Sequence, residues 1–238
     1  MFTRVISLGL LLLFFPAVLL AQTSVPPGTV LPLSLETTLE SGKTHPGKVV
    51  RARVMQNIPG TSIHRGAKVL GHVISITPTH ISLRFDTLVN HGTIIHITTD
   101  LRALASMLDI DLAQIPGGGA DRALTPEQRS ITLVGGEEDY RPDGPVTRGM
   151  DVVGQPTPYG VLARLQTNPP CRAELYGNDD PQALWLFSTD ACGLHGFSEL
   201  HVEHYGRTSP VGIIVLASKP GKLHIRSGSG LLLRVQAP

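Results

Sequence analysis

Histidines and acids that share a strand face are the first candidates for chemistry in this chain of 238 residues, which contains ten histidines. His201 and Glu203 are two apart in the segment HVEHY, so on a strand they lie on the same face. An imidazole and a carboxylate can share a divalent cation, but a zinc site needs a third protein ligand. His195, His224 or Asp190 could supply it if the fold brings them close. The alternative is a set of solvated strand histidines, which the lack of a metal-binding spacing motif favours.

Other catalytic chemistry has less support in the sequence. The segment RSGSGLL does not have the G-x-S-x-G spacing of a nucleophile elbow. Asp179 and Asp180 are neighbouring carboxylates in GNDDPQ, which is typical of a turn. A glycosidase would need two carboxylates held apart across a cleft. We therefore expect a protein without enzymatic activity and without a cofactor, and we keep a metal-dependent hydrolase as the enzymatic alternative.

Cys171 and Cys192 are the only cysteines of the chain. In an exported protein, two cysteines most simply pair with each other. A metal site would need two further soft ligands nearby, and the CxxC spacing is absent. We expect a disulfide that ties the loop before the segment ALWLFST to the turn just after it.

Aromatic side chains could form a platform for sugars, but few are present. The chain has one tryptophan and four tyrosines, and Trp185 lies between two leucines, as a core residue would. Tyr140 and Tyr205 are therefore the candidate ligand-binding residues. They keep open a peptidoglycan- or polysaccharide-binding function.

The N-terminus has the layout of a secretory signal peptide over residues 1–21. Arg4 precedes an apolar run, which ends at Ala21 before a polar stretch. Without Arg4, the remaining 19 basic residues balance 19 acidic ones, so there is no basic excess of the kind that nucleic-acid-binding proteins show. These features predict an exported protein. We expect no nucleic-acid partner and no stable membrane span once the leader is cleaved.

Short alternating segments separated by turns dominate residues 22–100. The first, TVLPLSLETTL, places its leucines on one face, and Pro32 predicts an edge or entry strand because it lacks a backbone N–H. KVVRARVMQNI, KVLGHVISI, HISLRFDTLV and TIIHITT follow. Gly71, inside the third segment, predicts a bulge or a close backbone approach. Five strands joined by Gly, Pro and Asn turns predict a mainly β fold, a small antiparallel β-barrel or sandwich.

The pattern changes after residue 100. An amphipathic helix is expected over residues 101–116, with Asp100 as its N-cap and Pro116 at its end. Its apolar stripe packs on the sheet or, alternatively, docks a partner protein. The stripe consists of Leu101, Leu104, Ala105, Leu108 and Leu112.

The rest of the chain is expected to be irregular at first and then β again. Residues 117–158 are rich in Gly, Pro and charged side chains, which predicts surface loops around one short strand, ITLVG. Residues 159–238 predict a second, loop-rich and disulfide-tied β region. Its last strand is a candidate to return to the barrel.

Residues 27–99 carry a set of motifs in a fixed order: PPGTVLPLSLETTLESG, PGKVVRARV, IHRGAKVLGHV and ISLRFDTL. This pattern resembles the β-barrel domain of TrbI-like subunits of conjugation-type secretion channels in the bacterial envelope. The closing segment KLHIRSGSGLLLRVQ, over residues 222–236, is similar to the returning barrel strand of that domain. The resemblance implies a barrel fold. Together with the leader, it leads us to expect a bacterial protein of the periplasm or the outer envelope, a structural or assembly module that contacts another envelope protein.

Overall fold

The computed structural model describes residues 24–58, 60–113, 129–140, 146–148, 150–157, 160–164, 181–183, 186–188 and 191–237. Strands make up most of them, and the helix among them is a short one, α1 (Met107–Leu112). The strands are β1 (Val30–Leu35), β2 (Leu39–Glu40), β3 (Val49–Val54), β4 (Lys68–Ile76), β5 (His80–Asn90), β6 (Thr93–His96), β7 (Thr99–Ala105), β8 (Arg129–Leu133), β9 (Gly136–Tyr140), β10 (Val146–Arg148), β11 (Asp151–Thr157), β12 (Gly160–Arg164), β13 (Pro181–Ala183), β14 (Gly193–His195), β15 (Leu200–His204), β16 (Ile214–Ser218), β17 (His224–Ile225) and β18 (Gly230–Val235).

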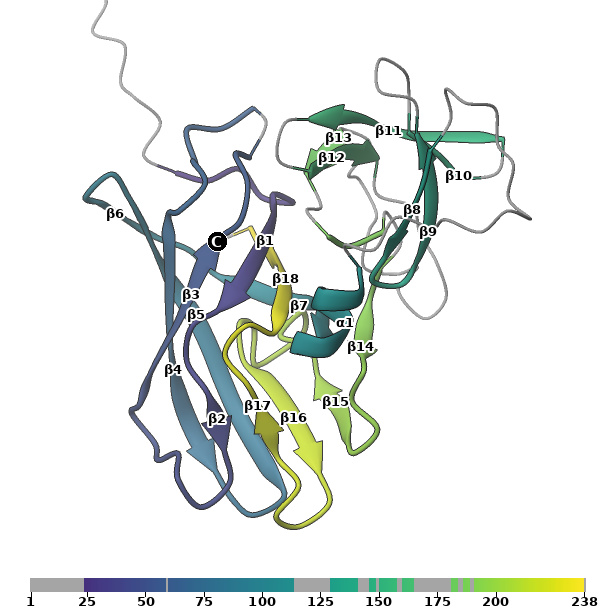
Figure 1. The fold of residues 1–238 in the computed structure, drawn as a ribbon. Coiled ribbons are helices and arrows are strands. Elements are labelled where there is room, and N and C mark those ends of the chain that lie inside the picture. Colours follow the sequence, from purple (N-terminus) through teal and green to yellow (C-terminus); the bar gives the residue numbers. More distant parts are fainter. Residues whose placement is uncertain are drawn as a thin grey trace, which may run out of the picture.

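Ten strands form one sheet that curves into a nearly closed barrel (Figure 1). The strand order is β14–β7–β18–β1–β3–β4–β5–β16–β15, and β6 pairs with β5. Neighbours pair antiparallel, except that β14 pairs parallel with β7. The two ends of the sheet meet, because the backbone N–H of Leu101 on β7 donates to the carbonyl of Tyr205 just after β15. The mainly β, barrel-like fold expected from the sequence is confirmed.

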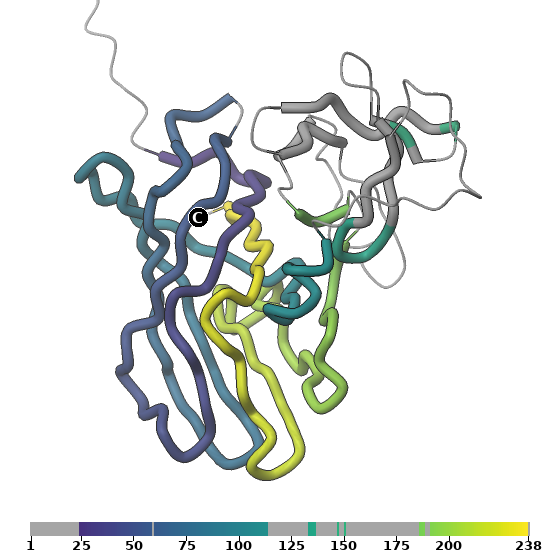
Figure 2. Tube along the Cα trace, in the orientation of Figure 1, coloured from purple at the N-terminus to yellow at the C-terminus, as the bar shows by residue number. Residues whose placement is uncertain are grey.

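β18, the last described strand, is part of the barrel wall and has a neighbouring strand on each side. β18 pairs with β1 on one side, with Leu31 opposite Leu233, and with β7 on the other. Figure 2 shows this yellow C-terminal segment beside the purple N-terminal strand. The barrel is therefore built from both ends of the sequence and extends well beyond residues 22–100.

Pro32 predicts an edge or entry strand, and the edge position is wrong: β1 is the first described strand but lies in the middle of the sheet. β1 pairs with both β18 and β3. The carbonyl of Pro32 accepts a hydrogen bond from Met55 just beyond β3, and the β1–β3 register begins at Leu33. Because the N and C=O of one strand residue point to the same side, the nitrogen of Pro32 faces the end of the ladder, where no N–H is needed.

The helix expected over residues 101–116 is wrong in its first part. Residues up to Ala105 belong to β7, which is buried along its whole length, and α1 is only six residues long. A strand covered on both faces has a continuous apolar run, which also matches helical spacing. The N-cap is Ser106 rather than Asp100, because the Ser106 hydroxyl accepts a hydrogen bond from the Asp109 N–H at 3.1 Å. The end of the expected helix lies outside the described residues.

The outer face of the wall formed by β7, β18 and β1 is covered by α1. Ile110 of α1 packs there beside Phe187 and Leu232 in a second apolar cluster. Gly230 on β18 makes room for this layer, since a β-carbon at Gly230 would lie 2.4 Å from Cδ1 of Ile110 and 3.0 Å from Cζ of Phe187. This part of the wall is therefore buried from both sides.

The inside of the barrel is filled with apolar side chains. Fully buried leucines from β1 and β18 meet Phe85 and Ile214 from the opposite wall. The cavity found there has a volume of about 10 Å³ and an apolar lining that includes Leu35 and Leu104. A space of this size holds no ligand larger than water. The barrel interior is a packed core and not a binding cup.

Most of the described part of residues 117–158 is strand, where loops around one short strand were expected. β8 overlaps the expected strand ITLVG, and β8 to β11 join β12 and β13 in a six-stranded sheet with the order β13–β12–β11–β10–β9–β8. β9 could not be predicted from patterning, because its sequence GEEDY is polar and lacks apolar alternation.

The predicted disulfide is not supported by the described structure. Cys171 lies outside the described residues, so no bridge to Cys192 is described, and the pairing stays a prediction.

Among the described residues, no helix has the length and apolar character needed to cross a membrane.

Gly71 is expected to tolerate no side chain. The register of β4 against β5 shifts at Gly71, which confirms the predicted irregularity, and a β-carbon there would lie 2.1 Å from the carbonyl oxygen of Arg84. We expect Gly71→Ala to lower the free energy of unfolding by about 3 kcal/mol, because backbone would have to move. Urea denaturation measures this loss. Ser75→Ala, at an exposed position of β4, is the control, and an unchanged urea midpoint for Gly71→Ala would contradict the prediction.

Candidate functional site

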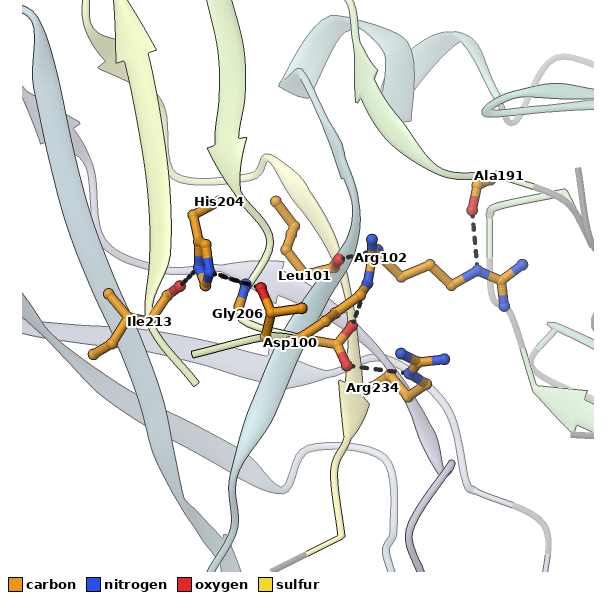
Figure 3. Close-up of polar contacts among 10 residues, drawn as sticks. Asp100, Leu101, Arg102, Ala191, His204, Gly206, Ile213 and Arg234 are labelled. Atoms are coloured by element: carbon orange, nitrogen blue, oxygen red, sulfur yellow. Dashed lines mark hydrogen bonds and ion pairs between the residues drawn. The ribbon is translucent and has the colours of Figure 1, made fainter. Parts of the chain in front are cut away.

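Asp100, on β7, is the centre of a buried ionic cluster in the barrel wall (Figure 3). Its side chain is completely buried. Arg207 Nε donates to Oδ1 of Asp100 at 3.2 Å, and Arg234 Nε donates to Oδ2 at 3.1 Å. Arg234 stands directly opposite Asp100 in the β7–β18 pair, whereas Arg207 follows β15. The cluster therefore connects the two ends of the barrel sheet.

Arg207 also contacts residues on both sides of the place where the two ends of the sheet meet, which we call the seam. A terminal nitrogen of its guanidinium donates to the carbonyl of Leu101 at 2.7 Å, and the guanidinium carbon lies 4.2 Å from the centre of the Tyr205 ring. His204 supports the same turn, since its Nδ1 lies 2.6 Å from the carbonyl oxygen of Ile213. A carboxylate enclosed in this way cannot touch a substrate, so the cluster serves the fold.

The charge state of Asp100 is set by two opposing effects. Burial raises the pKa of its carboxyl group above the ordinary value of 3.8, because the charged form loses hydration. Arg234 and then Arg207 act in the opposite direction and only partly offset the effect of burial on the pKa.

The third residue beside His201 and Glu203 differs from the three candidates expected for a metal site. His201 and Glu203 do lie together on β15, with His201 Nε2 at 3.7 Å from Oε1 of Glu203. The third member is His80, whose Nε2 lies 3.2 Å from the same oxygen. Ala217 stands between the two histidines in the sheet and leaves room above it for their rings to approach the carboxylate.

This cluster is one of exposed ion pairs. Within the described ranges, no group of three or more His, Cys, Asp or Glu side chains is arranged to hold a metal ion. The described ion pairs of Glu203 are with His80 and His201, whereas His195 lies on β14, His224 lies on β17, and Asp190 lies outside the described residues. His80 could not be found from spacing, because it is 123 residues from Glu203 in sequence.

Of the two tyrosines proposed to bind a sugar, the structure describes the side chain of Tyr205 but not that of Tyr140. Tyr205 is half-buried, packs against the barrel core and has Arg207 over its ring, so a ring face needed for stacking is already occupied. Tyr140 ends β9, and its side chain lies outside what the structure describes. Nothing described favours a sugar site at Tyr205.

An open pocket lies at the barrel rim between β3 and β4. Its volume is about 420 Å³, and Arg53, Val54, Met55, Asn57, Arg65 and Gly66 line it. The loop is fixed by two bonds: the backbone N–H of Arg65 donates to Oδ1 of Asn57 at 2.9 Å, and the N–H of Gly66 donates to the carbonyl of Val54 at 2.8 Å. Sequence patterning does not predict this hollow, because the hollow depends on how the loop turns.

Comparison with protein-family models, with characterised proteins and with solved structures gives no match to this chain.

Removing one arginine partner of Asp100 should destabilise the barrel. We expect Arg234→Met to lower the free energy of unfolding at pH 7 by about 3 kcal/mol, because the buried carboxylate loses one of its two counter-charges. Urea denaturation provides the measurement. The matched control is Glu203→Gln, which breaks exposed ion pairs and should cost less than about 1 kcal/mol. Equal losses for the two variants would contradict the assignment.

The raised pKa of Asp100 predicts the sign of a pH dependence. Between pH 3.8 and the raised pKa, the folded protein binds this proton more tightly than the unfolded chain does. The stability that Asp100 contributes is thus fully present below pH 3.8 and declines as the pH rises through the raised pKa. The stability advantage of the wild type over Asp100→Asn should therefore shrink with rising pH in unfolding experiments. If this advantage instead grows with rising pH, the arginines lower the pKa of Asp100 by more than burial raises it.

Proposed function

We propose that this chain is a non-enzymatic protein of the bacterial cell envelope, a structural or assembly module that contacts another protein. The observation that carries the proposal is the outward face of α1. Leu108 and Leu112 lie one helical turn apart on α1 and are 65% and 47% exposed, although the helix buries Ile110 against the barrel. Exposed apolar pairs on a fixed element are typical of a contact site for a partner.

The rest of the barrel favours a function in which its outer surface binds a partner. The interior is filled, so a ligand cannot be held there in the manner of a cup-shaped barrel. The wall beneath α1 is buried on both faces, which holds α1 at a fixed position (Figure 1). A helix held in this way presents Leu108 and Leu112 with little loss of conformational freedom on binding.

The envelope location rests on sequence features. Residues 1–21 have the layout of a signal peptide, and residues 27–99 resemble the TrbI-like barrel domain of envelope channels. Both features favour a partner in the periplasm or at the outer envelope. Binding of peptidoglycan or polysaccharide is the second candidate, and it now rests on Tyr140 alone.

Site-specific photo-crosslinking in cells tests the proposal. A photoreactive residue in place of Leu108 or of Leu112 should give one and the same crosslinked envelope protein, because both positions share one helix face. Ile74 on β4 is the matched control, since it is also an exposed apolar residue of the barrel, 39% exposed. The same adduct should be absent at Ile74.

A double variant gives an independent readout. Leu108→Ser together with Leu112→Ser should abolish co-purification of the crosslinked protein and leave the urea midpoint nearly unchanged, because both side chains are exposed. No adduct at either position, the same adduct at Ile74, or unchanged co-purification would each overturn the proposal.

A further inference from the structure

We infer that two copies of this chain pair through β6, a short edge strand of the barrel sheet. The two β6 strands run antiparallel and extend the sheet from one copy into the other, with Ile94 of each copy at the two-fold axis. β6 lies at the left of the barrel in Figure 1, away from α1. The inference therefore does not depend on the partner proposed above.

The backbone of β6 has one free side. In the described structure β6 pairs with β5 alone, and just beyond it the N–H of Ile97 donates to the carbonyl of Asp86 on β5 at 3.0 Å. Because the backbone groups of successive residues point to opposite sides of a strand, those of Ile95 also face β5, and those of Ile94 and His96 face outwards. Within the described residues, no hydrogen bond reaches these outward groups of Ile94 and His96.

This free edge continues an edge that is already covered. Gln236, just after β18, donates its N–H to the carbonyl of Thr98 at 2.8 Å. Thr98 is two residues beyond His96, so its carbonyl belongs to the same side of the chain as the outward groups of β6. A strand from another molecule beside β6 would therefore continue the ladder that β18 makes with β7.

The hairpin that carries β6 is fixed in place. Asn90, at the end of β5, is buried, and its side chain connects the turn to the loop before β4. Its Nδ2 donates to the carbonyl of Ser62 at 2.7 Å, and its Oδ1 accepts a hydrogen bond from the N–H of His64 at 3.4 Å. A fixed edge loses little conformational freedom when a second strand pairs with it.

The residue types of β6 leave this edge unprotected. Edge strands of natural proteins usually carry a charged residue or a proline, either of which hinders pairing with another chain. β6 has the sequence TIIH, which contains no proline, lysine, arginine, aspartate or glutamate. Ile94 is 64% exposed. The edge therefore has both free backbone groups and an apolar side chain to cover.

These features favour a second copy as the occupant. A two-fold contact brings the same surface of both copies together, so a charged strand would oppose like charges across the axis. β6 carries no such charge. With the axis at Ile94, the N–H and C=O of this residue bond to their equivalents in the other copy, and the two exposed side chains cover each other. Thr93 then stands opposite Ile95, so β-branched side chains lie on both sides of the axis.

Sedimentation velocity over a concentration series tests the inference. Four residues from each copy make a small interface, so we expect a reversible monomer–dimer equilibrium of the weak class. Ile94→Lys places two lysine side chains opposite each other and should weaken dimerisation by at least about tenfold. Val211→Lys, at a 46% exposed position outside β6, is the matched control and should dimerise like the wild type. A wild type that stays monomeric, or equal dimerisation by the two variants, would overturn the inference.

Cysteine crosslinking tests the register. Hydrogen-bonded residues opposite each other in an antiparallel pair have Cα atoms about 5.5 Å apart, within reach of a disulfide. Ile94→Cys should thus form a covalent dimer on mild oxidation. His96→Cys is the matched control, because it is exposed on the same face of β6 but its two copies would lie about 14 Å apart along the strands. The unmodified chain gives the background from its own cysteines. Equal crosslinking of the two variants would overturn the register and the inference.

A photoreactive residue in place of Ile94 tests for a different occupant. In cells it should capture a second copy of the chain. Capture of another protein alone, by a chain that stays monomeric when purified, would assign the edge to that protein and overturn the inference.

Discussion

The barrel depends on the contact between Asp100 and two arginines from distant parts of the chain. Arg234 belongs to the strand beside Asp100, and Arg207 follows the strand at the far end of the sheet. One carboxylate thus connects elements more than 100 residues apart in sequence. A charge without its partner at this depth would be costly, so the cluster favours the one arrangement in which the sheet ends meet. The packing of Arg207 on Tyr205 and its bond to Leu101 hold the same seam.

Around this seam, the molecule has two apolar layers with one wall in common. Leu231 and Leu233 of β18 face the barrel interior, and Leu232 between them faces the layer that contains α1. Both faces of β18 are covered up to Leu233, which explains the apolar run of three leucines before Arg234. Because the interior is filled, the described barrel can contact ligands and partners through its outer face and its rim.

The sequence predicted the parts of the fold in which alternation controls burial. Leu31, Leu33 and Leu35 face the core as their period of two indicates. Prediction failed where a strand is buried on both faces, because β7 has no alternation and its leucines also fit a helix. Pro32 gave the wrong position for β1, since it lies where the ladder needs no donor.

The candidate sites show the same limit. His201 and Glu203 are close in sequence and were found, whereas His80 joins them only through the sheet. The rim pocket depends on how the loop from Met55 to Ala67 turns, and Asp100 had the sequence signature of a helix cap. Spacing in the sequence identifies residues that are close along the chain. Each of these sites is formed by elements that are distant in sequence and that the topology of the sheet brings together.

The position of β18 has a consequence for how the protein is made. Because β18 lies between β1 and β7, the barrel cannot close until β18 has been synthesised. Until then, one edge of β1 lacks its neighbour, and contacts of such long sequence separation form slowly. During this delay the backbone groups along that edge of β1 are open to pairing with other chains, so early and late segments of this protein share control of its aggregation.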